Sequence, residues 1–309
     1  YRRTGTKLAH KLILGSLLLA AMIWSVGFYS VTVSERSLRR FIEGNSSVQA
    51  SKLIHEADGV IHAAIDEWRV CVKNPLVQRV LAASNRRFEQ MQDVRAYVDG
   101  QDRNWRAAPK GTITAFMKDL LSNELSETLK ARLDAHSQHE GYRVFGEVFL
   151  TNKYGANVAQ TGKTTDYRQD DEEWWQKARK DGMYVGDVEY DQSAGVYATN
   201  ICIRVDDGNG DFIGIVKAVF NIEKVFTLLR TRSRNANSLG LHSTNRQRLI
   251  LLTEEGKVLF DSDGRHVDLG DTFRALKTHD RPTTDLTHAF VRNDEKSGKV
   301  MDCGAISRG

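Results

Sequence analysis

Five strand-like segments follow one another in residues 141–220, GYRVFGEVFLTNKYGANVAQTGKTTDYRQDDEEWWQKARKDGMYVGDVEYDQSAGVYATNICIRVDDGNGDFIGIVKAVF. They are YRVFGEVFLTN, NVAQT, MYVGDVEY, GVYATNICIRV and DFIGIVKAVF, and most are separated by turns that contain glycine. One helix is inserted after the second segment, and helical sequence precedes the whole region. Helices followed by an antiparallel run of strands indicate an α+β fold.

The inserted helix carries its own start and stop signals. We predict Asp170 as its N-cap, with Glu173 completing a capping box, and Gly182 as the residue that ends it. Trp174 and Trp175 are candidates for its inward face. Because a helix start explains the acidic residues 170–173, they do not indicate paired catalytic carboxylates.

Working back toward the N-terminus, residues 12–33, LILGSLLLAAMIWSVGFYSVTV, contain no charged residue. A helix of this length spans the hydrocarbon core of a bilayer, which is about 30 Å thick, so we predict a transmembrane helix. Residues 1–11 contain four basic residues and no acidic one, which favours a cytoplasmic tail and an extracytoplasmic remainder. A cleaved secretory signal is the alternative, but its apolar part is ordinarily about 7–15 residues long.

The charge balance excludes one class of partner. The chain has 44 Lys and Arg residues against 40 Asp and Glu residues, and the whole excess lies in residues 1–11. A neutral remainder of mixed charge does not predict nucleic-acid binding.

Residues 34–140 have a helical pattern. Ile54, Ile61 and Trp68 are seven residues apart in an amphipathic helix that we expect to run to Pro75. This helix could pair with a second copy as a homodimer, or it could pack on its own domain. Two further helices are expected, over about 76–98 and from about 112 through Leu133.

A weak internal repeat links residues 148–162, VFLTNKYGANVAQTG, with residues 249–264, LILLTEEGKVLFDSDG. In both segments an apolar run leads through a polar turn with glycine into a second strand. The repeat suggests two related modules, the second smaller and incomplete, in a fragment of a longer membrane protein.

No motif of a hydrolase, zinc protease or nucleotide-binding site occurs. The cysteines, Cys71, Cys202 and Cys303, are far apart and predict neither a disulfide framework nor a zinc site. We therefore expect no catalytic site, no metal and no cofactor in this segment. A membrane-anchored extracytoplasmic enzyme would need a nucleophile and base that the sequence does not show. An anchored protein-binding domain would instead need an exposed apolar patch.

The segment from EVFLTN to NIEKV, about residues 147–225, resembles the membrane-distal module of double Cache sensor domains, with DEEWW and DVEYDQSAG as its most specific parts. These PAS-like domains are extracytoplasmic ligand-binding regions of bacterial receptors. The resemblance implies a sensor in the cytoplasmic (inner) membrane, with a histidine kinase as the expected output. A methyl-accepting chemotaxis transducer, a phosphatase or a cyclase is the alternative output. The implied domains are a cytoplasmic tail (1–11), a transmembrane helix (12–33), stalk and packing helices (34–140), a distal ligand-binding module (141–230) and an incomplete proximal module (231–309).

The same resemblance implies a small-molecule pocket in the distal module. Its lining would be Tyr167, Trp174, Trp175, Tyr184, Tyr190, Asp191 and Tyr197. The amino-acid-binding branch of the family uses Arg-x-Trp-Tyr and an Asp on the last strand. Here Glu172, Trp175 and an apolar residue near Val219 occupy those positions, so a cation, an amine or an uncharged ligand is the expectation.

Overall fold

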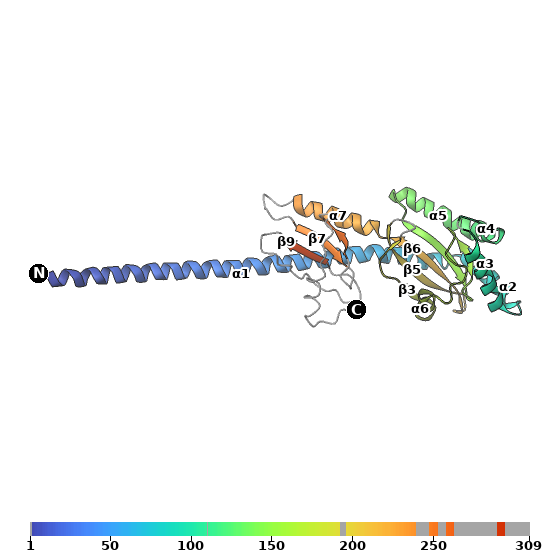
Figure 1. Ribbon diagram of the computed structural model, residues 1–309, viewed down its shortest axis with the longest axis horizontal. Helices are drawn as coiled ribbons and strands as arrows, with labels where there is room; N and C mark the ends of the chain where they lie inside the picture. Colours follow the sequence, from blue (N-terminus) through green and yellow to red (C-terminus); the bar gives the residue numbers. More distant parts are fainter. Residues whose placement is uncertain are drawn as a thin grey trace. The chain divides into compact units, whose positions relative to one another are not determined.

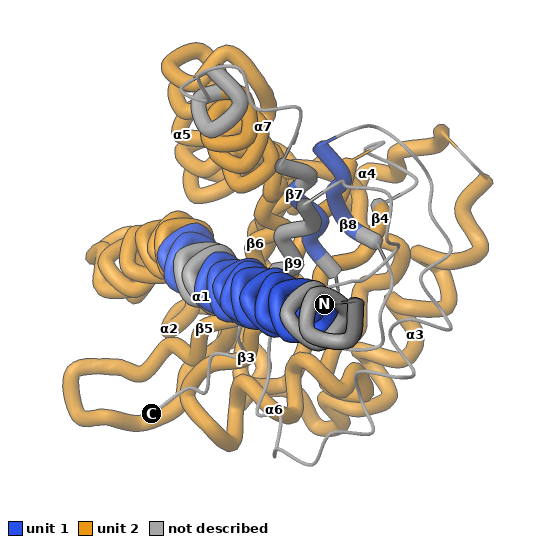
Figure 2. Tube along the Cα trace, turned by 90° about the vertical axis from the view of Figure 1, so that its left-hand side faces the viewer, with its two compact units in different colours: residues 1–54, 235–309 blue, residues 55–234 orange. Residues whose placement is uncertain are grey.

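The computed structural model describes residues 2–109, 111–191, 196–238, 247–252, 258–262 and 289–293. The chain divides into two compact units, which Figure 2 distinguishes by colour. One consists of His55–Arg234, and the other of Tyr1–Ile54 together with Asn235–Gly309. Each unit is described here by itself.

The centre of the unit His55–Arg234 is an antiparallel sheet of six strands, in the order β2-β1-β6-β5-β3, with β4 also paired to β5. The strands are β1 (Phe145–Asn152), β2 (Asn157–Gln160), β3 (Met183–Val185), β4 (Glu189–Asp191), β5 (Val196–Asp206) and β6 (Phe212–Asn221). The α+β class is therefore confirmed. The predicted strand MYVGDVEY is in fact two short strands, β3 and β4, which pair with different parts of β5.

Helices cover the sheet unequally on its two faces, and α5 and α6 lie on opposite sides of it (Figure 1). The helices are α1 (Arg2–Cys71), α2 (Pro75–Glu89), α3 (Val94–Ala107), α4 (Ala115–Ser122), α5 (Glu124–Glu140), α6 (Glu173–Asp181) and α7 (Glu223–Ser238). On the α5 face, Phe145 of β1 packs edge-on against Trp68 of α1 and His136 of α5. On the other face, α6 packs Trp174 against Phe149.

Several helix boundaries differ from the prediction because polar caps break the apolar pattern. Pro75 does not simply end the first helix, since it is the first residue of α2 and Asn74 caps that helix. The predicted helix 76–98 is divided where the Asp93 carboxylate accepts the backbone N–H of Ala96 and starts α3. The predicted helix through Leu133 is divided at Asn123 into α4 and α5.

The start of α6 also differs from the prediction. Asp170 is not its N-cap: the helix begins at Glu173, and Glu172 stands at the cap without a side-chain hydrogen bond. Its end agrees with the prediction, because Gly182 terminates it with a φ of 85°. Trp174 and Trp175 are both buried, as their predicted inward position requires.

The sequence repeat corresponds to a repeat of strand pairing. β7 (Gln247–Leu252) pairs with β8 (Val258–Asp261) just as β1 pairs with β2, and the register shifts at the matching step, after Leu150 in one hairpin and after Leu251 in the other. Each hairpin is closed by the same hydroxyl bond: Thr161 Oγ1 accepts the Val148 N–H, and Ser262 Oγ accepts the Leu249 N–H. β9 (Ala289–Asn293) then flanks β7 as β6 flanks β1. Most of the predicted proximal module, including Cys303, lies outside the described residues.

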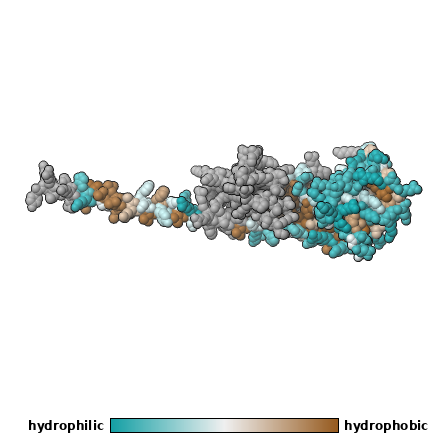
Figure 3. All heavy atoms as spheres, turned by 90° about the horizontal axis from the view of Figure 1, so that it is seen from below, coloured by the Kyte–Doolittle hydropathy of each residue, from teal (hydrophilic) through white to brown (hydrophobic). Residues whose placement is uncertain are grey.

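The N-terminal part of α1 includes His10–Leu38, a segment of 29 residues that is long and apolar enough to cross a membrane. The residues of this segment are exposed almost throughout. Figure 3 shows apolar colouring along it and a predominantly polar surface on His55–Arg234.

Candidate functional site

One face of the central sheet is incompletely covered beside α6. Four side chains of β1, β5 and β6 are only half-buried there, although these are the central strands. Their neighbours on the opposite face, such as Ile201 and Ala218, are fully buried. We call this region the open sheet face and define it by Glu147, Asn200, Lys217 and Val219.

Strand register places these residues in two adjacent rows. Lys217 of β6 lies between Phe149 of β1 and Cys202 of β5, and Tyr184 of β3 follows Cys202. In the next row, Val219 lies opposite Asn200. Lys217 and Asn200 thus lie among aromatic and aliphatic side chains on a surface where an ordinary core would be apolar throughout.

Lys217 is the central charge of the open sheet face. Its ammonium lies 4.5 Å from the Trp174 ring centroid and 5.6 Å from the Phe149 centroid. Within the described part of the chain, no carboxylate lies within ion-pair distance of it. The two aromatic rings stabilise the ammonium through cation–π contacts. Its positive charge is not neutralised by a carboxylate.

Buried groups surround this lysine. Cys202 is fully buried, and burial raises the pKa of its thiol to about 12, so it is a neutral packing residue at pH 7. Gln160 continues the row from Phe149 on β2, and it is also fully buried. Neither amide atom of the Gln160 side chain has a hydrogen-bond partner in the described structure. Buried amides are normally hydrogen-bonded to protein or to water. The Gln160 amide therefore offers a donor and an acceptor at this edge of the site that no described protein group occupies.

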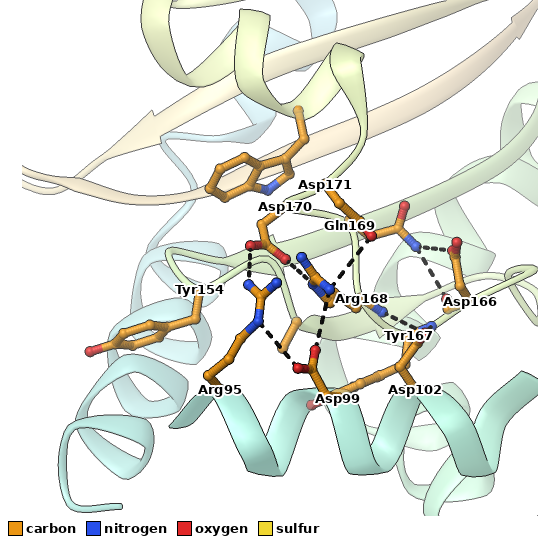
Figure 4. Close-up of polar contacts among 12 residues, drawn as sticks. Arg95, Asp99, Asp102, Tyr154, Asp166, Tyr167, Arg168, Gln169, Asp170 and Asp171 are labelled. Carbon is orange, nitrogen blue, oxygen red and sulfur yellow. Dashed lines mark hydrogen bonds and ion pairs between the residues drawn. The ribbon is translucent and has the colours of Figure 1, made fainter. Parts of the chain in front are cut away.

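The loop that leads into α6 is held in place by α3. The Asp102 carboxylate accepts the backbone N–H groups of Tyr167 and Arg168, at 2.9 and 3.1 Å. Arg168 pairs with Asp99 of α3 and with Asp170, and Arg95 pairs with Asp170 at 2.8 Å (Figure 4). The Asp170 carboxylate therefore connects the loop to α3 through ion pairs, and this explains why it does not cap α6.

Asp166 is the most deeply buried acid of this loop, with 8% of its surface exposed. Burial raises the pKa of its carboxyl, while the hydrogen bond from Gln169 and the charge of Arg106 act in the opposite direction. This acid is a structural member of the loop, since its partners are the loop itself and α3.

The predicted pocket residues do not form one group. Trp174, Trp175 and Tyr184 share one hydrophobic cluster beside α6. Within it Trp174 contacts Phe149, next to the open sheet face, whereas Trp175 contacts Thr151 and Phe212. Tyr167 is buried in a separate cluster with Trp105 and Phe116.

The last three predicted residues lie further along the sheet. Tyr190 packs against Tyr197, and Tyr197 against Phe226 of α7. The side chain of Asp191 lies outside the described residues.

Sequence reasoning missed Glu147, Gln160, Asn200 and Lys217. A signal was available for one of them, because Lys217 interrupts an otherwise apolar strand, GIVKAVF. We expect from the sequence a ligand cation on an aromatic face, but at Trp174 the structure places a cation of the protein there instead. The protein's own Lys217 ammonium already occupies the face of that ring.

No protein-family model and no curated protein matches the sequence. Three of the solved structures that match are extracellular or ligand-binding domains of receptors. The extracellular domain of histidine kinase rpHK1S-Z16 is 17% identical, with 56% of this chain and 74% of that chain covered and a TM-score of 0.33. The ligand-binding domain of the Pseudomonas aeruginosa amino-acid chemoreceptor PctC, in complex with GABA, is 14% identical, with 60% and 73% covered and a TM-score of 0.32. The ligand-binding domain of the Campylobacter jejuni chemoreceptor Tlp3, in complex with L-norvaline, is 12% identical, with 81% and 86% covered and a TM-score of 0.39.

Proposed function

We propose that this chain is the extracytoplasmic small-molecule sensing region of a transmembrane signalling receptor of the sensor histidine kinase type, and that it binds its ligand on the open sheet face. The observation that carries the proposal is the half-buried polar set on the central strands of a sheet whose opposite face is packed. Sites for small molecules combine mostly apolar and aromatic side chains with a few polar groups, and this set has that composition.

The charge of the site indicates the chemistry of the ligand. An ammonium without a carboxylate partner, held against two aromatic rings, favours a ligand with an anionic group at Lys217. Asn200 and Glu147 provide further polar groups on the neighbouring strands. Trp174 and Tyr184 would flank the apolar part of the ligand.

The membrane anchor supports a receptor. The segment His10–Leu38 would cross the cytoplasmic (inner) membrane, with the basic tail inside and the sensing unit outside. Homodimerisation through the part of α1 that precedes Trp68 is part of the proposal, because the seven-residue spacing of Ile54 and Ile61 suits a paired helix. Trp68 itself is buried against Phe145 of its own unit.

A route from the site to α1 lies within the unit His55–Arg234. β1 carries Phe149 on the open sheet face and Phe145 on the opposite face, and Phe145 contacts Trp68 near the end of α1. Arg132 of α5 holds Glu67 of the same helix at 2.9 Å. A ligand that changes the position of β1 would therefore change the packing of α1.

A thermal-shift screen of the full chain in detergent micelles tests the binding site. We expect small carboxylates, amines and amino acids to include compounds that raise the melting temperature, and Lys217→Met to remove that shift. Lys118→Met is the matched control, because Lys118 is exposed on α4. A hit that binds Lys217→Met and wild type equally would refute the proposed site.

The coding sequence downstream of Gly309 tests the receptor type. We expect a second apolar span followed by a kinase domain. A methyl-accepting segment in its place would make the protein a chemotaxis transducer, and a catalytic domain of another class would refute the kinase assignment.

A further inference from the structure

A second candidate site lies on the other side of α6 from the open sheet face. It is a groove of about 1000 Å³ between the start of α3, α6 and the ends of β5 and β6. Its charged lining residues are Arg95, Lys153, Asp170, Arg179, Lys180 and Arg204. Trp174 faces the open sheet face and Trp175 lines the groove, so α6 separates the two sites.

Arg179 is an exposed but ordered cation in this groove. Its guanidinium lies over the Trp175 ring at 5.5 Å and over the Phe212 ring at 5.2 Å. Trp175 is itself fixed, because its indole N–H donates to Thr151 Oγ1 at 2.9 Å. In the described structure Arg179 has no carboxylate partner. The two rings stabilise the cation, and its N–H groups have no carboxylate to bind, so they are available for an oxyanion.

Two further cations lie beside Arg179. Arg204 also lies over Phe212, at 5.1 Å, and its Nη1 donates to the Arg179 carbonyl oxygen at 2.8 Å. Its Nε pairs with the Asp206 carboxylate at 2.6 Å, so its charge is compensated. Lys180 follows on the helix and, like Arg179, has no carboxylate partner within the described residues.

The opposite wall of the groove is neutralised. Arg95 pairs with Asp170 at 2.8 Å, and Lys153 pairs with Glu89 at 2.6 Å. The uncompensated positive charge is therefore concentrated at the C-terminal end of α6. The helix dipole favours cations there, but it does not account for an arginine stacked on two rings that face a groove.

We propose that this groove is a second ligand site, and that it binds a multiply charged oxyanion, such as a polycarboxylate or a phosphate ester, through Arg179 and Lys180. The stacked guanidinium of Arg179 makes a paired contact with two oxygens of the ligand, and Lys180 supplies a point charge. This site is independent of the one assigned to the sensing function.

Isothermal titration of the full chain in detergent micelles, with citrate and with pyrophosphate as probes, tests the proposal. We expect at least one probe to bind, and Arg179→Gln with Lys180→Gln to weaken it by about tenfold or more, since hydrogen bonds to charged groups are worth about 1.5–3 kcal/mol. Arg179→Lys keeps the charge but loses the planar group, and it should also weaken binding.

Lys177→Gln is the control on the same helix, because Lys177 lies over Tyr184 and outside the groove. It should leave the affinity for the probe unchanged, and so should Lys217→Met on the open sheet face. Failure of both probes to bind refutes the proposal, as does an equal loss in Lys177→Gln, which would indicate unspecific attraction to basic surface. A probe lost only in Lys217→Met binds the sensing site and also refutes it.

Discussion

Position 155 accommodates only glycine without strain, because its backbone has a positive φ and its surroundings are closely packed. Its φ is 78°, and a Cβ at this position would lie 2.6 Å from the backbone nitrogen of Asp170 and overlap the Asp170 side chain. The Gly155 carbonyl also accepts the N–H of Gln169 at 2.8 Å. The hairpin β1–β2 and the loop before α6 therefore meet at this glycine.

We expect Gly155→Ala to lower the free energy of unfolding by about 2–4 kcal/mol, from the left-handed conformation and from overpacking together. Gly210→Ala is the control: its φ is 88°, but a Cβ there meets open space. It should cost only about 1–2 kcal/mol. Urea unfolding of both variants measures the difference, and equal losses would mean that contact with Asp170 is unimportant.

Asp166 gives a pH-dependent prediction. Burial raises the pKa of its carboxyl above the ordinary value of 3.8, so the folded state binds this proton more tightly than the unfolded state. The protonated Asp166 carboxyl contributes its full stability below pH 3.8, and this stability is lost as the pH rises through the pKa of the folded state. Asp166→Asn should therefore gain stability relative to wild type between about pH 4 and pH 7.

Urea unfolding of wild type and Asp166→Asn at both pH values measures this gain. Asp119→Asn is the control, because it removes an exposed carboxylate from α4. A variant that loses stability relative to wild type as the pH rises would show that the ion pair with Arg106 outweighs burial.

Secondary-structure elements are joined in this protein by polar caps, and Asn123 is the clearest example. It stands between α4 and α5, where its Oδ1 accepts the Ser126 N–H at 3.0 Å. Its Nδ2 donates to the carbonyl oxygen of Val158 on β2 at 2.9 Å and to that of Leu120 at 3.2 Å. One side chain thus starts a helix and attaches it to the edge of the sheet.

We expect Asn123→Ala to destabilise the fold by about 2–3 kcal/mol, because it removes a cap and takes the amide donor from the Val158 carbonyl. The Leu120 carbonyl keeps a hydrogen bond from the Ser126 hydroxyl. Asn74→Ala is the matched control, since Asn74 caps α2 through one hydrogen bond to Leu76. It should cost about 1 kcal/mol. Thermal unfolding of the two variants measures the difference. Equal losses of stability would show that the hydrogen bond from Asn123 to Val158 adds nothing beyond helix capping.

The whole molecule is expected to be an integral membrane protein. The chain should stay with the membrane fraction through an alkaline carbonate wash and leave it only in detergent. Leu18→Arg with Leu19→Arg should reduce retention, because each arginine at the centre of a span costs about 2.5–3.5 kcal/mol on insertion scales.

Leu38→Arg, at the end of the apolar segment, is the control and should leave retention unchanged. Full retention of the double variant would show that another part of the chain holds the protein on the membrane.

Local pattern determined much of the architecture. The alternation of apolar residues and the turn glycines predict the strands, and the likeness of 148–162 to 249–264 predicts two related modules. The structure adds that the two hairpins share a register shift. The uncharged run predicts the apolar part of α1. These features depend on residues close together in the sequence, so periodicity reveals them.

The candidate sites required the tertiary structure. The sequence around Asp170 predicts a helix cap, but in the structure Asp170 binds Arg95, which lies 75 residues earlier in the chain. Trp174 and Trp175 are neighbours in sequence, yet the sheet places them on two different sites. The surroundings of Lys217 depend on the strand order, which puts Phe149 beside it, and on α6, whose Trp174 lies over its ammonium. The sequence by itself determined most strands and the apolar segment that is long enough to cross a membrane. The packing of distant segments decided which side chains are buried, paired or half-exposed, because those contacts join residues far apart in the chain.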